Sequence, residues 1–152
     1  MQQVEERADW LSNSANPGAF APYLRLSPLP GARPPRPFLI QESRGDQNVP
    51  NPHTAEVVRA GLLADRVTLY RHDLFASKLS FKNPHSFIIR TDLAVMQSVA
   101  LGAQEQLARF FESDGAIVID PDLDADGIDA DGSDPLFEVP ASSVPDDFGF
   151  IL

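Results

Sequence analysis

A pattern of strand, helix and strand in the middle of the chain constrains the fold most strongly. The apolar run at residues 37–41 and the β-branched and aromatic run at residues 67–70 are both typical of buried strands. Residues 52–63 between them have a helical pattern, with Asn51 as N-cap and Pro52 at the first helical position. Strands joined in this way lie parallel, with the helix crossing over the sheet. We therefore predict an α/β fold built on a parallel sheet.

An acidic loop separates the first predicted strand from the helix. Its sequence is Gly45-Asp46-Gln47-Asn48-Val49-Pro50. The Gly permits a tight exit from the strand, and the Pro fixes the backbone before the helix. Active sites of open parallel sheets gather at the carboxyl ends of the strands, so Asp46 is a candidate functional acid. The alternative is an Asp that only stabilises a turn.

The remaining regions complete a division of the chain into three parts. Residues 92–113 carry apolar side chains at spacings of three and four, which predicts a core helix that stops before Gly115, and residues 116–119 are predicted to form a last short strand. The parts are a short helix followed by a proline-rich apolar coil (1–35), the α/β region (36–119) and an acidic, largely irregular tail (120–152). Such a long apolar coil is usually functional or covers a surface supplied by something else.

The negative charge is concentrated in the tail. Residues 1–113 contain all 12 Lys and Arg and 11 of the 22 Asp and Glu, whereas residues 114–152 contain 11 acids and no base. A near-neutral body with an acidic appendage argues against a nucleic-acid partner. The absence of Cys excludes disulfides, thiolate metal ligands and Cys nucleophiles. We expect a soluble chain with neither a transmembrane segment nor a signal peptide, and the sequence leaves the compartment open.

Two motifs and the helix after them resemble a known family. The segments Gly45-Asp46-Gln47-Asn48-Val49-Pro50-Asn51 and Asn83-Pro84-His85-Ser86-Phe87, followed by the apolar helix, resemble the carboxyl-terminal part of α/β-hydrolases, particularly bacterial esterase- and lipase-like serine hydrolases. The resemblance covers roughly residues 36–119. In that family a Gly-Asp-x-x-Val-Pro loop carries the acid of the catalytic triad, and a later His is the base. The resemblance implies that Asp46 and His85 have these roles, that the substrate is a small-molecule or lipid ester, and that no cofactor is required.

The chemistry explains why these residue types are needed. A Ser hydroxyl becomes a good nucleophile when an imidazole removes its proton, and a carboxylate on the other ring nitrogen fixes the tautomer and stabilises the imidazolium. His72, which also follows a strand and stands beside Asp73, is the alternative base. We assign no role to His53, which is predicted to lie in the first turn of a helix, where a cation is mildly disfavoured.

The sequence departs from the family at the nucleophile. It contains no Gly-x-Ser-x-Gly motif, and the nearest imitation centres on Ser43, which is not followed directly by a helix and stands only three residues before Asp46. We therefore expect the acid and the base of a triad without its nucleophile. Such a chain is predicted to be inactive alone and to need a missing amino-terminal part, or another chain, to complete the fold.

The tail suggests a second candidate site. Asp122, Asp124 and Asp126, followed by Gly127, resemble the start of a calcium loop, although Ser133 stands where an EF-hand has Glu. A disordered acidic segment is the alternative. The three His have spacings that match no standard zinc site. The competing function is a non-catalytic α/β interaction module with a calcium-binding or disordered tail.

Overall fold

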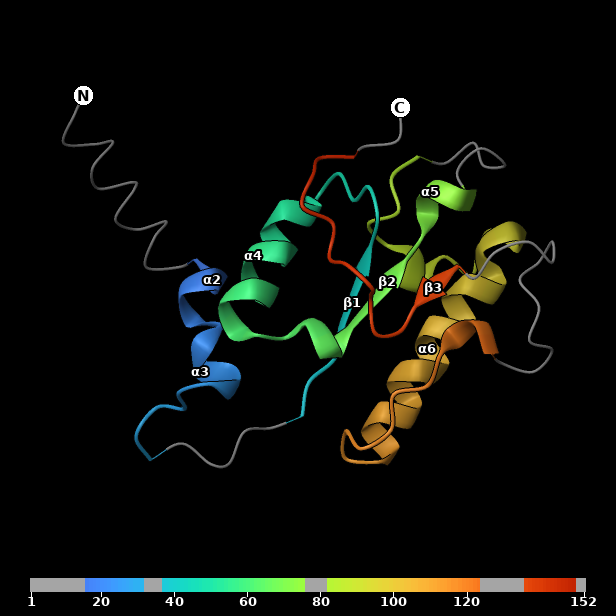
Figure 1. Cartoon of the computed structure of the whole chain (residues 1–152). Helices are drawn as coiled ribbons and strands as arrows, with labels where there is room; N and C mark the ends of the chain where they lie inside the picture. Colours follow the sequence, from blue (N-terminus) through green and yellow to red (C-terminus); the bar gives the residue numbers. More distant parts are fainter. Residues whose placement is uncertain (1–15, 32–36, 76–81, 124–135, 150–152) are drawn as a thin grey trace, which may run out of the picture.

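The protein is a small α/β structure with a three-stranded mixed sheet and helices on both faces (Figure 1). The computed structural model describes residues 16–31, 37–75, 82–123 and 136–149. The strands are β1 (Ile40–Ser43), β2 (Val67–Tyr70) and β3 (Phe137–Glu138), in the order β1-β2-β3. β1 and β2 are parallel, as predicted, whereas β3 is antiparallel to β2.

β2 forms where the sequence predicts it, and β1 is displaced from its predicted position. All four residues of β2 are buried, which suits its β-branched and aromatic side chains. The first strand was predicted at residues 37–41 but lies at Ile40–Ser43, because Ile40 pairs with Val67 and the ladder continues to the Arg44 N–H, which donates to the Tyr70 carbonyl at 2.9 Å. The strand therefore includes polar residues that an apolar pattern does not predict.

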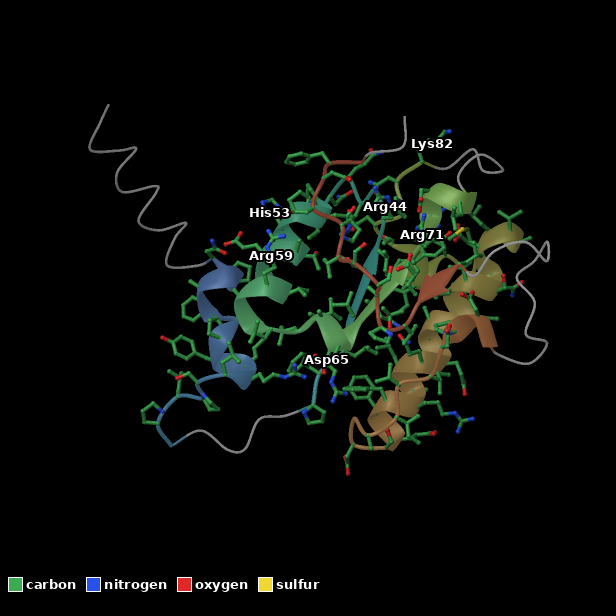
Figure 2. The ribbon with its side chains drawn as sticks, viewed as in Figure 1. Arg44, His53, Arg59, Asp65, Arg71 and Lys82 are labelled. Carbon is green, nitrogen blue, oxygen red and sulfur yellow. The ribbon has the colours of Figure 1, made fainter. Side chains whose placement is uncertain are left out.

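Helix α4 (Asn51–Gly61) connects the two parallel strands and covers one face of the sheet. The prediction that Asn51 caps this helix is wrong: Asn51 is its first helical residue, and Pro50 occupies the N-cap position. The Asn51 amide instead accepts from the Gly45 N–H at 2.8 Å and donates to the Ser43 carbonyl at 2.9 Å, which ties the helix to the end of β1. His53 and Arg59 also lie on α4 (Figure 2).

Two short helices pack beside α4 in the region predicted to be coil. They are α2 (Pro17–Phe20) and α3 (Pro22–Arg25), each with a Pro at its start, a position where the missing N–H has no cost. The predicted coil is therefore wrong for this stretch, and the short helix predicted at residues 2–12 lies outside the described residues. Five large apolar side chains in this region are exposed: Phe20, Tyr23, Leu24, Leu26 and Leu29.

The opposite face is covered by α6 (Gln97–Glu112). The predicted helix began at residue 92, but short 3-10 turns, η3 (Phe87–Ile89) and η4 (Ala94–Met96), precede α6. The predicted stop is confirmed at Gly115, which has a φ of +80° and donates its N–H to the Phe110 carbonyl at 2.7 Å. Among the described residues, 116–119 form no strand, and the third strand comes from the tail instead.

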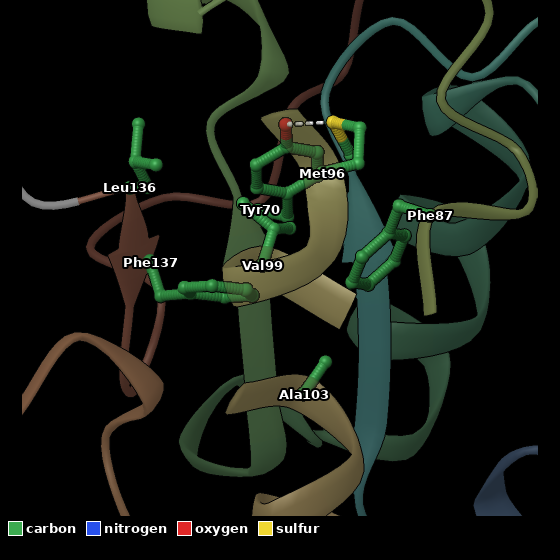
Figure 3. Packing of buried hydrophobic residues seen from close by; sticks show 7 residues of the cluster. All are labelled: Tyr70, Phe87, Met96, Val99, Ala103, Leu136 and Phe137. Atoms are coloured by element: carbon green, nitrogen blue, oxygen red, sulfur yellow. Dashed lines mark hydrogen bonds between the residues drawn. The ribbon is translucent and has the colours of Figure 1, made fainter. Parts of the chain in front are cut away.

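Part of the acidic tail belongs to the core, which corrects the prediction of a largely irregular segment. Leu136 and Phe137 join Tyr70, Phe87, Met96, Val99 and Ala103 in one buried cluster between β2 and α6 (Figure 3). The Tyr70 ring centroid lies 5.0 Å from that of Phe87 and 5.4 Å from that of Phe137. Such aromatic pairs contribute about 0.5–1.5 kcal/mol each beyond their buried area. A second cluster beneath α4 includes Ala141 of the tail.

Two acids in the described residues 136–149 of the tail also form ion pairs with the α/β region. Asp146 pairs with Arg59 of α4 at 2.8 Å, and Asp147 pairs with Arg44 at 3.2 Å. These acids neutralise bases of the α/β region rather than forming a separate acidic surface. Within the described part of the chain, no helix is long and apolar enough to cross a membrane.

Candidate functional site

The candidate site lies beyond the carboxyl ends of β1 and β2, where the acidic loop meets residues 83–87. Gly45 adopts a φ of +85°, a conformation that favours glycine, and turns the chain out of the strand so that Asp46 follows immediately. Asp46 Oδ1 accepts from the backbone N–H groups of Asn48 at 2.8 Å and Val49 at 2.9 Å. The carboxylate therefore stabilises its own turn, and these bonds also fix its orientation.

The same carboxylate contacts His85. The Nδ1 atom of His85 lies 2.9 Å from Asp46 Oδ2 and 3.1 Å from Oδ1. The Asp46 side chain is 12% exposed, and that of His85 is 40% exposed. A carboxylate beside Nδ1 favours the neutral tautomer that carries its proton there, which leaves Nε2 able to accept a proton. The two side chains paired by the resemblance to α/β-hydrolases therefore lie within hydrogen-bond reach, and their roles as acid and base stay predictions.

Asn83 joins the two loops and was not anticipated from the sequence. Its Oδ1 accepts from the N–H of Gln47 at 3.1 Å and from the N–H of His85 at 3.2 Å. Its Nδ2 donates to Oδ1 of Asn48 at 2.6 Å. The signal available in the sequence was an Asn two residues before the candidate base, in a proline-containing loop.

Glu42 is a buried carboxyl directly beneath the acidic loop. It is 6% exposed, and among the described residues neither of its oxygens makes a well-formed hydrogen bond. Burial raises the pKa of Glu42 to about 7, against the lowering effects of the Asn51 and Thr54 side chains and the Arg44 charge. Sequence reasoning missed this group, because no local pattern shows that a Glu in a strand lies buried near the helix α4.

The other candidates from the sequence occupy different surroundings. His72 starts the short helix α5 (His72–Phe75) and is completely buried, with its Nδ1 3.1 Å from the Tyr70 hydroxyl. His53 is exposed in the first turn of α4, as predicted. Ser43 is buried at the end of β1, and its hydroxyl donates to the Pro84 carbonyl at 3.5 Å. These contacts of His72 and Ser43 are made with Tyr70 and with Pro84.

Charged side chains border the site where β2 ends (Figure 2). Arg71 pairs with Asp73 at 2.8 Å and with Glu138 of β3 at 2.8 Å, and the Asp73 carboxylate lies 3.9 Å from Arg44. Burial raises the pKa of Asp73, but the Arg71 hydrogen bonds and charge outweigh it and hold this pKa below its ordinary value. The Asp73 carboxylate is thus engaged with Arg71 and Arg44.

The structure describes only part of the predicted calcium loop. Oδ2 of Asp122 accepts from the backbone N–H of Phe137, and thereby joins the short turn η5 (Pro121–Leu123) to β3. Asp124 and Asp126 lie outside the described residues. Within the described ranges, no group of three or more His, Cys, Asp or Glu side chains is placed to hold a metal ion. Calcium binding therefore stays a sequence-based prediction. In the structure, the Asp122 carboxylate accepts a backbone hydrogen bond from β3.

No protein-family model, curated protein or solved structure matches this chain. The resemblance to α/β-hydrolases accordingly depends on the residues of the two loops and on the order of the surrounding elements.

Proposed function

We propose that this chain is the carboxyl-terminal part of a carboxylic-ester hydrolase of the α/β-hydrolase type, with Asp46 as the acid and His85 as the base of a Ser-His-Asp triad. The observation that carries the proposal is the 2.9 Å contact between Asp46 Oδ2 and His85 Nδ1 at the carboxyl ends of two parallel strands. The nucleophilic serine comes from outside residues 1–152, so the chain alone is expected to be inactive.

The geometry suits the proton transfers of ester hydrolysis. Asp46 holds the Nδ1 proton of His85, and Nε2 takes the proton of the serine hydroxyl as its oxygen attacks the ester carbonyl carbon. His85 then returns that proton to the departing alcohol, and a water molecule, activated in the same way, releases the acid product. The imidazolium formed in each step is stabilised by the adjacent carboxylate.

The exposure of the two groups supports the same division of roles. Asp46 is nearly buried and receives two backbone N–H bonds, which suits an orienting carboxylate that stays in one place. His85 is more exposed, which gives a substrate and a serine access to its ring. Ser43 does not suit the role of nucleophile, because it is buried and its hydroxyl is directed to a backbone carbonyl.

The proposal is tested by expressing this chain together with the coding region upstream of it and measuring hydrolysis of p-nitrophenyl esters. We expect His85→Ala to lower kcat by a factor on the order of 10⁴ or more, because the serine then has no base. His53→Ala is the matched control, since it removes an exposed imidazole from α4. Equal hydrolysis by the wild type and His85→Ala would overturn the assignment of the base.

A further inference from the structure

We infer that Asn83 is a positioning residue that holds the acidic loop and the loop of residues 83–87, here called the base loop, in the register required by the Asp46–His85 pair. This inference depends on the proposed function, since it assigns Asn83 a task in the same proton transfers. In its three described bonds, Asn83 contacts neither the His85 ring nor the Asp46 carboxylate. It acts through the backbone N–H groups of His85 and of Gln47, the residue that follows Asp46.

The contacts of Asn83 connect two segments that are distant in the sequence. One oxygen, Oδ1, accepts N–H groups from both loops: that of Gln47 at 3.1 Å and that of His85 at 3.2 Å. The amide nitrogen donates to Asn48 at 2.6 Å, which adds a second connection to the acidic loop. A displacement of either loop relative to the other must therefore break a bond to Asn83.

The acidic loop is anchored independently on its other side. Asn51 fixes the N–H of Gly45 and the carbonyl of Ser43, both before Asp46, and its side chain is buried. Asn83 fixes the backbone directly after Asp46. The carboxylate thus lies between two asparagines that bind the backbone of the acidic loop. Of the two, Asn83 is the one that belongs to the base loop.

The exposure of these bonds indicates that they orient the Asp46–His85 pair more than they stabilise the fold. All three bonds of Asn83 are solvent-exposed, so each contributes about 1 kcal/mol or less to folding. The Asp46–His85 contact is sensitive to small movements, because a displacement of about 1 Å in a catalytic arrangement can cost about 10²-fold in rate. Loss of Asn83 should therefore leave the chain folded and loosen the pair.

The experiment measures the tautomer of His85 by nitrogen NMR of the ¹⁵N-histidine-labelled 152-residue chain, at a pH where the ring is neutral. His85→Gln identifies the signals of that ring. We expect the wild type to show the tautomer protonated at Nδ1, and Asn83→Ala to lose this single form in favour of a mixture. Asn48→Ala, which breaks only one of the three bonds, should give a smaller loss.

In the protein completed with its upstream part, Asn83→Ala should lower kcat by about 10²-fold with little change in KM.

Two controls separate this inference from the proposed function. Asn16→Ala also removes an Asn with two side-chain bonds, to Gly18 and Glu56, and should leave the His85 tautomer unchanged. In Asp46→Asn, the Asn48 and Val49 N–H groups hold the amide oxygen at the Oδ1 position, so an NH₂ donor replaces the Oδ2 acceptor that faces Nδ1. This variant should therefore abolish the wild-type pattern. If Asp46→Asn abolishes it while Asn83→Ala and Asn48→Ala preserve it, the inference about Asn83 is wrong and the pair stands.

The reverse result has a different meaning. If the pattern survives Asp46→Asn, Asp46 does not hold the ring, and both the triad assignment and the inference are overturned. Should Asn83→Ala fail to fold, Asn83→Ser is measured in the same way, with loss of the single tautomer expected and an unchanged pattern counting against the inference.

Discussion

His72 and His85 both follow β2, and the structure gives them opposite surroundings. His72 is completely buried, with its Nδ1 3.1 Å from the Tyr70 hydroxyl. His85 has a 40% exposed side chain, and its Nδ1 lies 2.9 Å from Asp46 Oδ2. A catalytic base needs both a partner that fixes its tautomer and access to the substrate. His85 combines the two, whereas burial beside a hydroxyl suits a packed side chain.

The comparison shows that order along the chain does not by itself identify a functional histidine. Both rings come after the same strand, and His72 even stands next to an acid in the sequence. That acid, Asp73, pairs with Arg71 at 2.8 Å in the structure. The partner of a histidine is set by the loop packed against it, and for His85 this loop lies 39 residues earlier in the chain.

After His85→Ala, the largest effect is expected for Asp46→Asn in the protein completed with its upstream part. The NH₂ group of the amide, in the place of Oδ2, cannot accept the Nδ1 proton of His85. The wrong tautomer is therefore favoured, and kcat should fall about 10⁴-fold. Measurement of kcat and KM for ester hydrolysis checks this, with His72→Gln as the comparison on the buried ring. A similar loss in both variants, per folded molecule, would remove the distinction between the two histidines.

The sequence predicted those parts of the site that depend on local pattern and topology. β2 and the crossing helix follow from apolar runs and helical spacing, whereas the pairing of Asp46 with His85 was implied by the resemblance of the two loops to α/β-hydrolases. The contribution of Phe137 to the sheet could not be predicted, because it depends on pairing with Tyr70, which is distant in the sequence. The bonds of Asn83 were missed for the same reason: each partner in the acidic loop is about 35 residues away.

Glu42 extends the comparison from buried and exposed histidines to carboxyl groups. Burial raises its pKa from 4.5 to about 7, so between these values the folded state retains a proton that the unfolded chain has lost. Its contribution to stability is therefore full below about pH 4.5 and is lost as the pH rises through 7. The wild type should lose about 3 kcal/mol more than Glu42→Gln between those limits.

Urea unfolding of the wild type and of Glu42→Gln at about pH 5 and about pH 8 measures this difference. The variant serves as its own reference, because all other titrating groups are shared and cancel in the comparison. Parallel pH dependences in the two proteins would show that the Glu42 carboxyl ionises normally in the folded state.

A smaller effect on stability separates the two rings directly. His72→Ala leaves a cavity in the core and removes one of two partners of the Tyr70 hydroxyl, the other being the Met96 sulfur. We expect a loss of about 2 kcal/mol in the free energy of unfolding. His85→Ala, at a half-exposed position, should cost less than about 1 kcal/mol. Urea titrations of both variants at one pH give the two values. Equal losses would mean that the His85 ring is also needed for the fold.

The smallest effect is expected for His53→Ala, which sets the baseline for both comparisons. His53 is exposed in the first turn of α4, where its backbone N–H donates to the Pro50 carbonyl at 2.9 Å, a bond that alanine retains. The free energy of unfolding should change by less than about 0.5 kcal/mol near neutral pH. Its ester hydrolysis in the completed protein should equal that of the wild type, since the ring has neither the carboxylate partner of His85 nor the burial of His72. A tenfold loss of kcat in His53→Ala would place a required imidazole on the helix and contradict the choice of His85 on grounds of its partner and exposure.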